Sequence, residues 1–178
     1  MCYASTYVKF LRCGAYDAAS GNTANFAVGK WGGDYILLEG CYAWGSGRYK
    51  FMGYQGDHII FRNCVGRADI ISAGSDPCAI FSMYSCDYSL VQNCIAIDSD
   101  QDSSYSASLF QGPFFVPSTD MNANYTTFEN CIALNVHLGG PQTAASSYRQ
   151  SYYDTFKNCV IWNCPPRSGG EIYGLWLR

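Results

Sequence analysis

The feature that most constrains this chain is a repeat in which one short pattern returns around a cysteine every 23 to 37 residues. Six segments align without gaps, namely residues 7–16, 35–44, 58–67, 88–97, 125–134 and 153–162. Their cysteines are Cys13, Cys41, Cys64, Cys94, Cys131 and Cys159. A motif that returns at such intervals is typical of a solenoid, in which each repeat packs only against its neighbours.

Each column of this alignment has one physical character. A flat ring stands six positions before every cysteine, an apolar residue stands three positions before it, and a small residue stands two positions after it in five of the six repeats. The residue just before the cysteine is Arg12, Gly40 or, in the other four repeats, Asn. Asn and Gly adopt the left-handed backbone conformation most readily, so we expect a sharp bend between two short strands there.

A further strand-like segment lies between the aligned blocks, at residues 25–28, 49–52, 79–82 and 108–110. Each repeat therefore predicts three strands and three turns, and such strands must pair with their equivalents in the next repeat. Only 14% of the residues are charged, which suits strands better than surface helices. We predict an all-β chain with one domain over residues 1–178, a right-handed parallel β-helix of about six rungs and three parallel sheets.

The motif Phe128-Glu129-Asn130-Cys131-Ile132-Ala133 and its variants resemble the parallel β-helix repeats of the pectin-lyase-like superfamily. The resemblance covers roughly residues 7–176. It implies the fold, but this superfamily contains lyases, glycoside hydrolases and purely structural solenoids. Gly56-Asp57-His58 departs from the Gly-His-Gly pattern of the related polygalacturonases, and their paired Asp-Asp motif is missing, which argues against hydrolase activity.

The lyases of this superfamily use Arg or Lys to neutralise a uronate and abstract its proton. A polysaccharide lyase-like activity is therefore the alternative function, with Arg48, Arg62, Arg67 and the row Asp34, Asp57 and Asp87 as its candidate residues. The acidic row has a second interpretation that we favour. Asp is a common turn residue because its side chain bonds to nearby backbone amides, so a repeated turn produces a repeated Asp.

The six aligned cysteines are expected to form an interior file in which each thiol packs as a small hydrophobe. Their side chains would project in parallel, which suits a disulfide badly. Neither paired Cys-x-x-Cys nor nearby His residues are present, so we expect no metal and no cofactor. Cys2, Cys78, Cys86 and Cys164 lie off the column, and a disulfide between Cys78 and Cys86 stays open.

Two further sets of residues have competing interpretations. Asp98, Asp100 and Asp102 alternate like the start of a calcium loop, but the central Gly and closing Glu are missing, so a solvated turn is favoured. Tyr42, Trp44, Tyr49 and Tyr54 are candidates for an outward row that stacks against sugar rings. The same rings can instead pack beneath the long loops that follow Cys94 and Cys131.

The net charge of −3 provides no basic field for nucleic acid, and no apolar run is long enough to cross a bilayer. No cap is visible at either end of the repeat array, and residues 171–177 have the pattern of a strand that opens a seventh rung. We therefore expect a non-catalytic, extracellular or cell-surface structural solenoid, either a fragment or a subunit that self-associates through its ends. The alternative is a β-helix that binds or cleaves an acidic polysaccharide.

Overall fold

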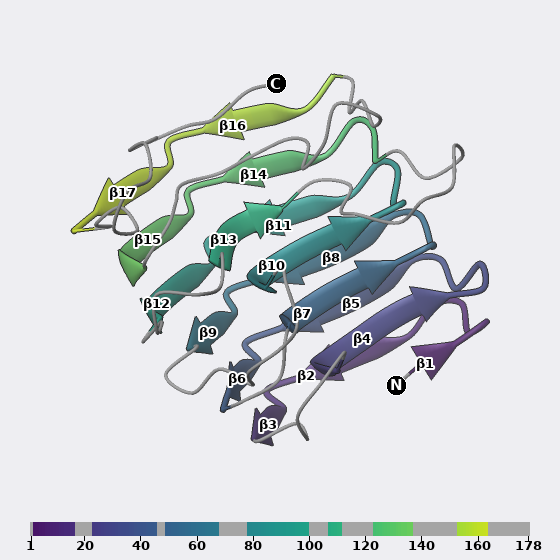
Figure 1. Ribbon diagram of the computed structural model, residues 1–178. Coiled ribbons are helices and arrows are strands. Elements are labelled where there is room, and N and C mark those ends of the chain that lie inside the picture. Colours follow the sequence, from purple (N-terminus) through teal and green to yellow (C-terminus); the bar gives the residue numbers. More distant parts are fainter. Residues whose placement is uncertain are drawn as a thin grey trace.

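The computed structural model describes residues 2–16, 23–45, 49–67, 78–99, 107–111, 123–136 and 153–163. Every strand in these ranges belongs to one of three parallel sheets, and the described residues contain no helix (Figure 1). The chain passes through the three sheets in turn and then starts the next rung, so it forms a parallel β-solenoid. The predicted all-β, three-sheet architecture is confirmed.

Sheet A has five strands, and sheets B and C have six strands each. Sheet A contains, in spatial order, β1 (Cys2–Tyr3), β4 (Ala24–Lys30), β7 (Tyr49–Tyr54), β10 (Cys78–Tyr84) and β13 (Ala107–Gln111). Sheet B contains β2 (Lys9–Leu11), β5 (Ile36–Glu39), β8 (Ile59–Arg62), β11 (Leu90–Gln92), β14 (Thr127–Glu129) and β16 (Thr155–Lys157). Sheet C contains β3 (Gly14–Tyr16), β6 (Tyr42–Trp44), β9 (Val65–Arg67), β12 (Ile95–Ser99), β15 (Ile132–Val136) and β17 (Val160–Trp162).

The register of the sheets places each column of the sequence alignment in one line along the solenoid. In sheet B, Phe61 pairs with Leu38 on one side and Val91 on the other, and Val91 pairs with Phe128. In sheet C, Ala96 pairs with Gly66 and Ala133 in the same way. Equivalent residues of successive repeats therefore lie directly over one another, as the repeat predicted.

The interior is filled by apolar residues from all three sheets. Phe26, Phe51 and Phe81 of sheet A stack with ring centroids 5.2 and 4.9 Å apart, and Phe51 and Phe61 meet across the core with centroids at 5.8 Å. The small column of sheet C faces this aromatic packing. A Cβ added to Gly66 would collide with Cγ2 of Ile80, so the interior has no room for a larger side chain there.

Residues with positive φ recur at equivalent places in successive rungs. The column just before each cysteine has φ between 52° and 63° in all six repeats, which agrees with the predicted left-handed bend. Positive φ also occurs in sheet C, at Asp98 and Asn135 near the ends of β12 and β15 and at Asn163 just after β17. The aromatic column before sheet B also has positive φ, which the sequence did not predict because bulky side chains rarely adopt this conformation.

Candidate functional site

The aromatic column forms one continuous stack along the corner between sheets A and B. We call it the aromatic file, and it consists of Tyr7, Tyr35, His58, Tyr88, Tyr125 and Tyr153. Successive ring centroids are 5.1, 4.5, 5.5, 4.9 and 4.8 Å apart, and successive ring planes differ by 7° to 20°. These distances match the rung spacing of a parallel sheet, so the backbone register itself sets the stacking.

The aromatic file lies at the surface. Its tyrosines are between 44% exposed at Tyr125 and 78% exposed at Tyr7, and the two end rings are the most exposed. Because each inner ring has its two faces against neighbouring rings, its exposed area is the ring edge. The file therefore offers solvent a regular row of aromatic edges rather than open faces.

The acidic row lies at the same corner and bonds to the backbone. The carboxylate of Asp34 accepts a hydrogen bond from the amide of Asp57 (2.8 Å), and that of Asp57 accepts one from Asp87 (2.9 Å). The carboxylate of Asp87 accepts bonds from both the backbone amide (2.8 Å) and the side-chain amide (3.1 Å) of Asn124. Each of these acids thus fixes the start of the following turn, beside the aromatic file.

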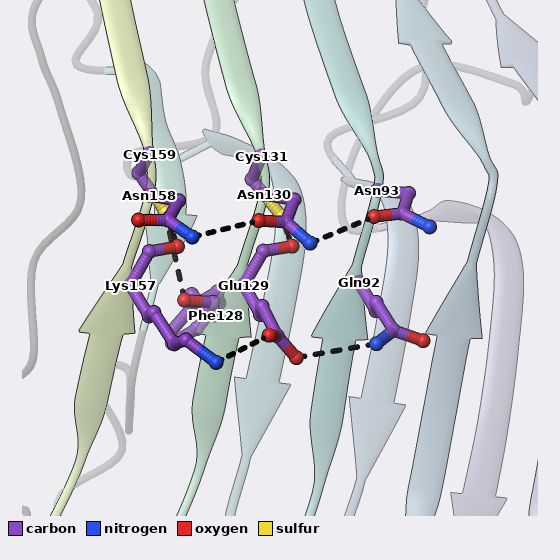
Figure 2. A network of polar contacts seen from close by, with 9 residues as sticks. All are labelled: Gln92, Asn93, Phe128, Glu129, Asn130, Cys131, Lys157, Asn158 and Cys159. Atoms are coloured by element: carbon purple, nitrogen blue, oxygen red, sulfur yellow. Dashed lines mark hydrogen bonds and ion pairs between the residues drawn. The ribbon is translucent and has the colours of Figure 1, made fainter.

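The opposite end of sheet B carries an asparagine file, which consists of Asn63, Asn93, Asn130 and Asn158, and Figure 2 shows the last three of them. From Asn93 onward, each side-chain amide donates to the side-chain oxygen of the asparagine in the preceding rung, and all three distances are 3.2 Å. Asn93 and Asn130 therefore each use one donor and one acceptor within the file while they hold the left-handed corner.

A second polar row lies one residue before the asparagine file, on the outer face of sheet B. Arg62 donates to Gln92 at 3.0 Å. Gln92 donates to Glu129 (3.2 Å), and Lys157 forms an ion pair with Glu129 at 2.8 Å (Figure 2). The bond from Lys157 lowers the pKa of Glu129, and the same bond raises the pKa of Lys157. Both side chains stay charged at neutral pH. The row from Arg62 to Lys157 bridges four successive rungs.

The cysteine file lies inside the same corner, and its described members are free thiols. Each thiol from Cys41 onward donates to the carbonyl three positions before the cysteine of the preceding rung, at 3.3 to 3.5 Å. Burial raises the pKa of Cys41 and Cys94. The thiols of Cys41 and Cys94 are therefore neutral packing groups, as expected for buried cysteines.

Cys159, at the last described rung, is only partly buried. A hydrogen bond from Cys131 lowers the pKa of the Cys159 thiol to about 6. Off the column, burial raises the pKa of Cys86 to about 12. Cys86 is a free, buried thiol, so the disulfide with Cys78 that the sequence left open is not formed. The side chains of Cys2 and Cys78, and all of Cys164, lie outside the described residues.

The structure does not bring together those candidate lyase residues that it describes. Arg62 lies on the outer face of sheet B and bonds to Gln92, whereas Arg67 ends β9 in sheet C and pairs with Asp98 at 3.4 Å. The acidic row lies at the far corner of sheet B, where its carboxylates accept backbone bonds. Arg48 lies outside the described residues.

The proposed sugar-stacking residues do not form one row. Tyr42 and Trp44 belong to β6 and contact each other with centroids at 4.7 Å, whereas Tyr49 and Tyr54 lie at the two ends of β7. Tyr49 is only 3% exposed, so the expectation of an outward ring is wrong there. Tyr54 stacks on Tyr84 at 4.7 Å.

The calcium alternative gains no ligand cluster in the described part of the chain. Asp98 pairs with Arg67 and accepts a bond from the side-chain amide of Asn135 at 3.2 Å. Asp100, Asp102 and residues 171–177 lie outside the described residues. Within the described ranges no group of three His, Cys, Asp or Glu residues is arranged to hold a metal ion.

Two features of the structure were not predicted from the sequence, the exposed aromatic file and a buried lysine. The aromatic column was recognised as a column of flat rings, but its exposure and its positive φ were not predicted. Lys50 is 1% exposed, and its ammonium group donates to the carbonyl of Gly45 at 2.6 Å. The neighbouring pattern Tyr49-Lys50-Phe51 contains no signal for a buried lysine, because a lysine in an alternating strand normally faces solvent.

Comparison of the chain with models of protein families, with curated proteins and with solved structures found no match. Among the described residues no helix has the length and apolar character needed to cross a membrane. The parallel β-solenoid is therefore established by its own strand pairing, while membership of the pectin-lyase-like superfamily stays a prediction.

Proposed function

We propose that this protein is a non-catalytic, extracellular structural β-solenoid that adds further β-helical rungs at its edges. The observation that carries the proposal is the use of the repeated polar columns. The acidic row, the asparagine file and the row from Arg62 to Lys157 all bond between adjacent rungs. Side chains engaged in this way stiffen a rod, whereas a catalytic set requires them to converge on a substrate. The resemblance to pectin-lyase-like proteins supports the extracellular location.

The edge of the described sheets supports growth by strand addition. The carbonyl of Val8 and the amide of Arg12 both bond to β5 or its adjoining corner. Because successive residues of a strand point their backbone groups to opposite sides, the amides of Lys9 and Leu11 in β2 point away from β5. A row of such groups is a template for another strand. A second copy of the chain is the occupant we propose for this edge.

Sedimentation velocity of the full chain over a range of concentrations, combined with electron microscopy, tests this proposal. We expect head-to-tail association that grows with concentration. The variant Lys9→Pro removes one outward amide and leaves the bonds to β5 in place, so it should reduce association without lowering the unfolding temperature. Lys9→Ala is the matched control, since it keeps the amide. A chain that stays monomeric at every concentration would contradict the proposal.

A second candidate function is glycan binding along the aromatic file, which is favoured by its exposed and regular row of ring edges. Phenol groups at a fixed spacing are suited to bond a polymer of hydroxylated units laid along the rod. A panel of uronate polymers tests both glycan binding and lyase activity. Binding that Tyr88→Ala abolishes would support a glycan-binding function, and new absorbance from unsaturated products would support a lyase.

A further inference from the structure

The aromatic file contains two runs of neighbouring tyrosines, separated by His58. Tyr88, Tyr125 and Tyr153 form the longer run, with centroids 4.9 and 4.8 Å apart and ring planes within 8° of parallel. Tyr7 and Tyr35 form the shorter run at 5.1 Å. All five rings are exposed, so an oxidant in solvent has access to every phenol.

We propose that the run Tyr88, Tyr125 and Tyr153 is a modification site at which one-electron oxidation joins neighbouring rungs through dityrosine. Coupling requires two phenoxyl radicals within reach of each other. The positive φ of each tyrosine and the in-register strands β11, β14 and β16 hold these rings over one another. Two phenoxyl radicals formed on neighbouring rings are therefore already within reach of each other.

The reaction balances with a one-electron oxidant such as a peroxidase acting with hydrogen peroxide. Each of two phenols gives one electron and its hydroxyl proton to the oxidant. The two radicals then join through ring carbons ortho to the oxygens, and the hydrogens on those carbons move to the oxygens and restore the phenols. One carbon–carbon bond forms, two carbon–hydrogen bonds break, and two electrons and two protons leave the protein.

Exposure decides which stacked pairs react. The new bond forces the two rings out of their parallel stack, which requires free rotation of the side chains. Tyr125 and Tyr153 are 44% and 73% exposed and have that freedom. Tyr54 and Tyr84 stack as closely, at 4.7 Å, but Tyr84 is 2% exposed. A ring held in a close-packed interior cannot make this movement, so the Tyr54–Tyr84 pair serves as an internal negative control.

The test treats the dilute, folded chain with a peroxidase and hydrogen peroxide after accessible thiols are alkylated. We expect a monomer that has lost two hydrogen atoms, with dityrosine fluorescence, and digestion should yield cross-linked peptides that join Tyr88 to Tyr125 or Tyr125 to Tyr153. Tyr125→Phe should lose both peptides and keep the one that joins Tyr7 to Tyr35. Tyr54→Phe should leave the pattern unchanged.

His58→Tyr provides a gain-of-function arm, because it joins the two runs into one file of six tyrosines. It should add cross-links from residue 58 to Tyr35 and Tyr88. The proposal is overturned if Tyr125→Phe keeps the wild-type yield of internal cross-links. It is overturned equally if Tyr54 and Tyr84 couple as well as the file, or if chain unfolded in urea gives the same peptides.

Discussion

The asparagine file allows a direct measurement of what one corner contributes to stability, and Asn130 is the position to change. Its side-chain amide donates to Asn93, and its side-chain oxygen accepts from Asn158, both at 3.2 Å. Its backbone has φ of 54°. The same column holds Gly40 in the second rung, with φ of 63°, so Gly is compatible with this corner. The substitutions Asn130→Gly and Asn130→Ala therefore separate the amide bonds from the backbone conformation.

The expected magnitudes follow from these two terms. Both variants lose two hydrogen bonds at an exposed position, each contributing about 0.5 kcal/mol. Gly adds an entropic cost of about 0.5 to 1 kcal/mol because its unfolded chain is more flexible. Ala instead places a Cβ in the left-handed region, which costs about 1 to 2 kcal/mol. We expect a loss of about 1.5 to 2 kcal/mol for Asn130→Gly and about 2 to 3 kcal/mol for Asn130→Ala.

Urea unfolding followed by circular dichroism measures both variants against the wild type. The dependence on urea should be unchanged, because neither substitution alters the surface exposed on unfolding. Gly40→Ala is the matched control, since it introduces the same backbone conflict at a position that has no side-chain amide to lose. The reasoning is refuted if Asn130→Ala is no less stable than Asn130→Gly, or if both variants lie within about 0.5 kcal/mol of the wild type.

Two further predictions concern packing and ionisation. Gly56→Ala should destabilise by about 3 kcal/mol or more, because its Cβ would collide with backbone atoms of Gly33 and Gly29, which no side-chain rotation can move. Gly14→Ala, whose Cβ meets Trp44 at 3.7 Å and the carbonyl oxygen of Tyr42 at 4.0 Å, both ordinary van der Waals contacts, should stay within about 0.5 kcal/mol of the wild type in the same urea unfolding measurement. Burial raises the pKa of Cys86 from 9.0 to about 12, so its contribution is complete below pH 9 and is lost as the pH rises through about 12. Relative to Cys86→Ala, the wild type should lose about 1.4 kcal/mol per pH unit across that window, and parallel pH profiles for the two proteins would contradict the assignment.

Much of this architecture was determined by the sequence alone, because a solenoid is nearly one-dimensional. Each rung contacts only the rungs beside it. A residue type that recurs at one position of the repeat therefore specifies one line of contacts along the axis. The cysteine column, the apolar column that contains Phe61 and the asparagine bend were all predicted in this way, and the strand register confirms them. The interior position of the thiols followed from the same repeat.

Only the tertiary structure decided what faces solvent and which polar groups meet. Tyr49 is buried, whereas the tyrosines of the aromatic file are exposed, and the residue type alone does not distinguish them. Arg62 bonds to Gln92, and Asp57 bonds to a backbone amide, because Asp57 lies just before β8 and Arg62 lies at its end. A repeat specifies what stacks along the axis, whereas contacts around a rung depend on how three sheets and their corners close on one another. The spacing of residues along the chain does not contain that information.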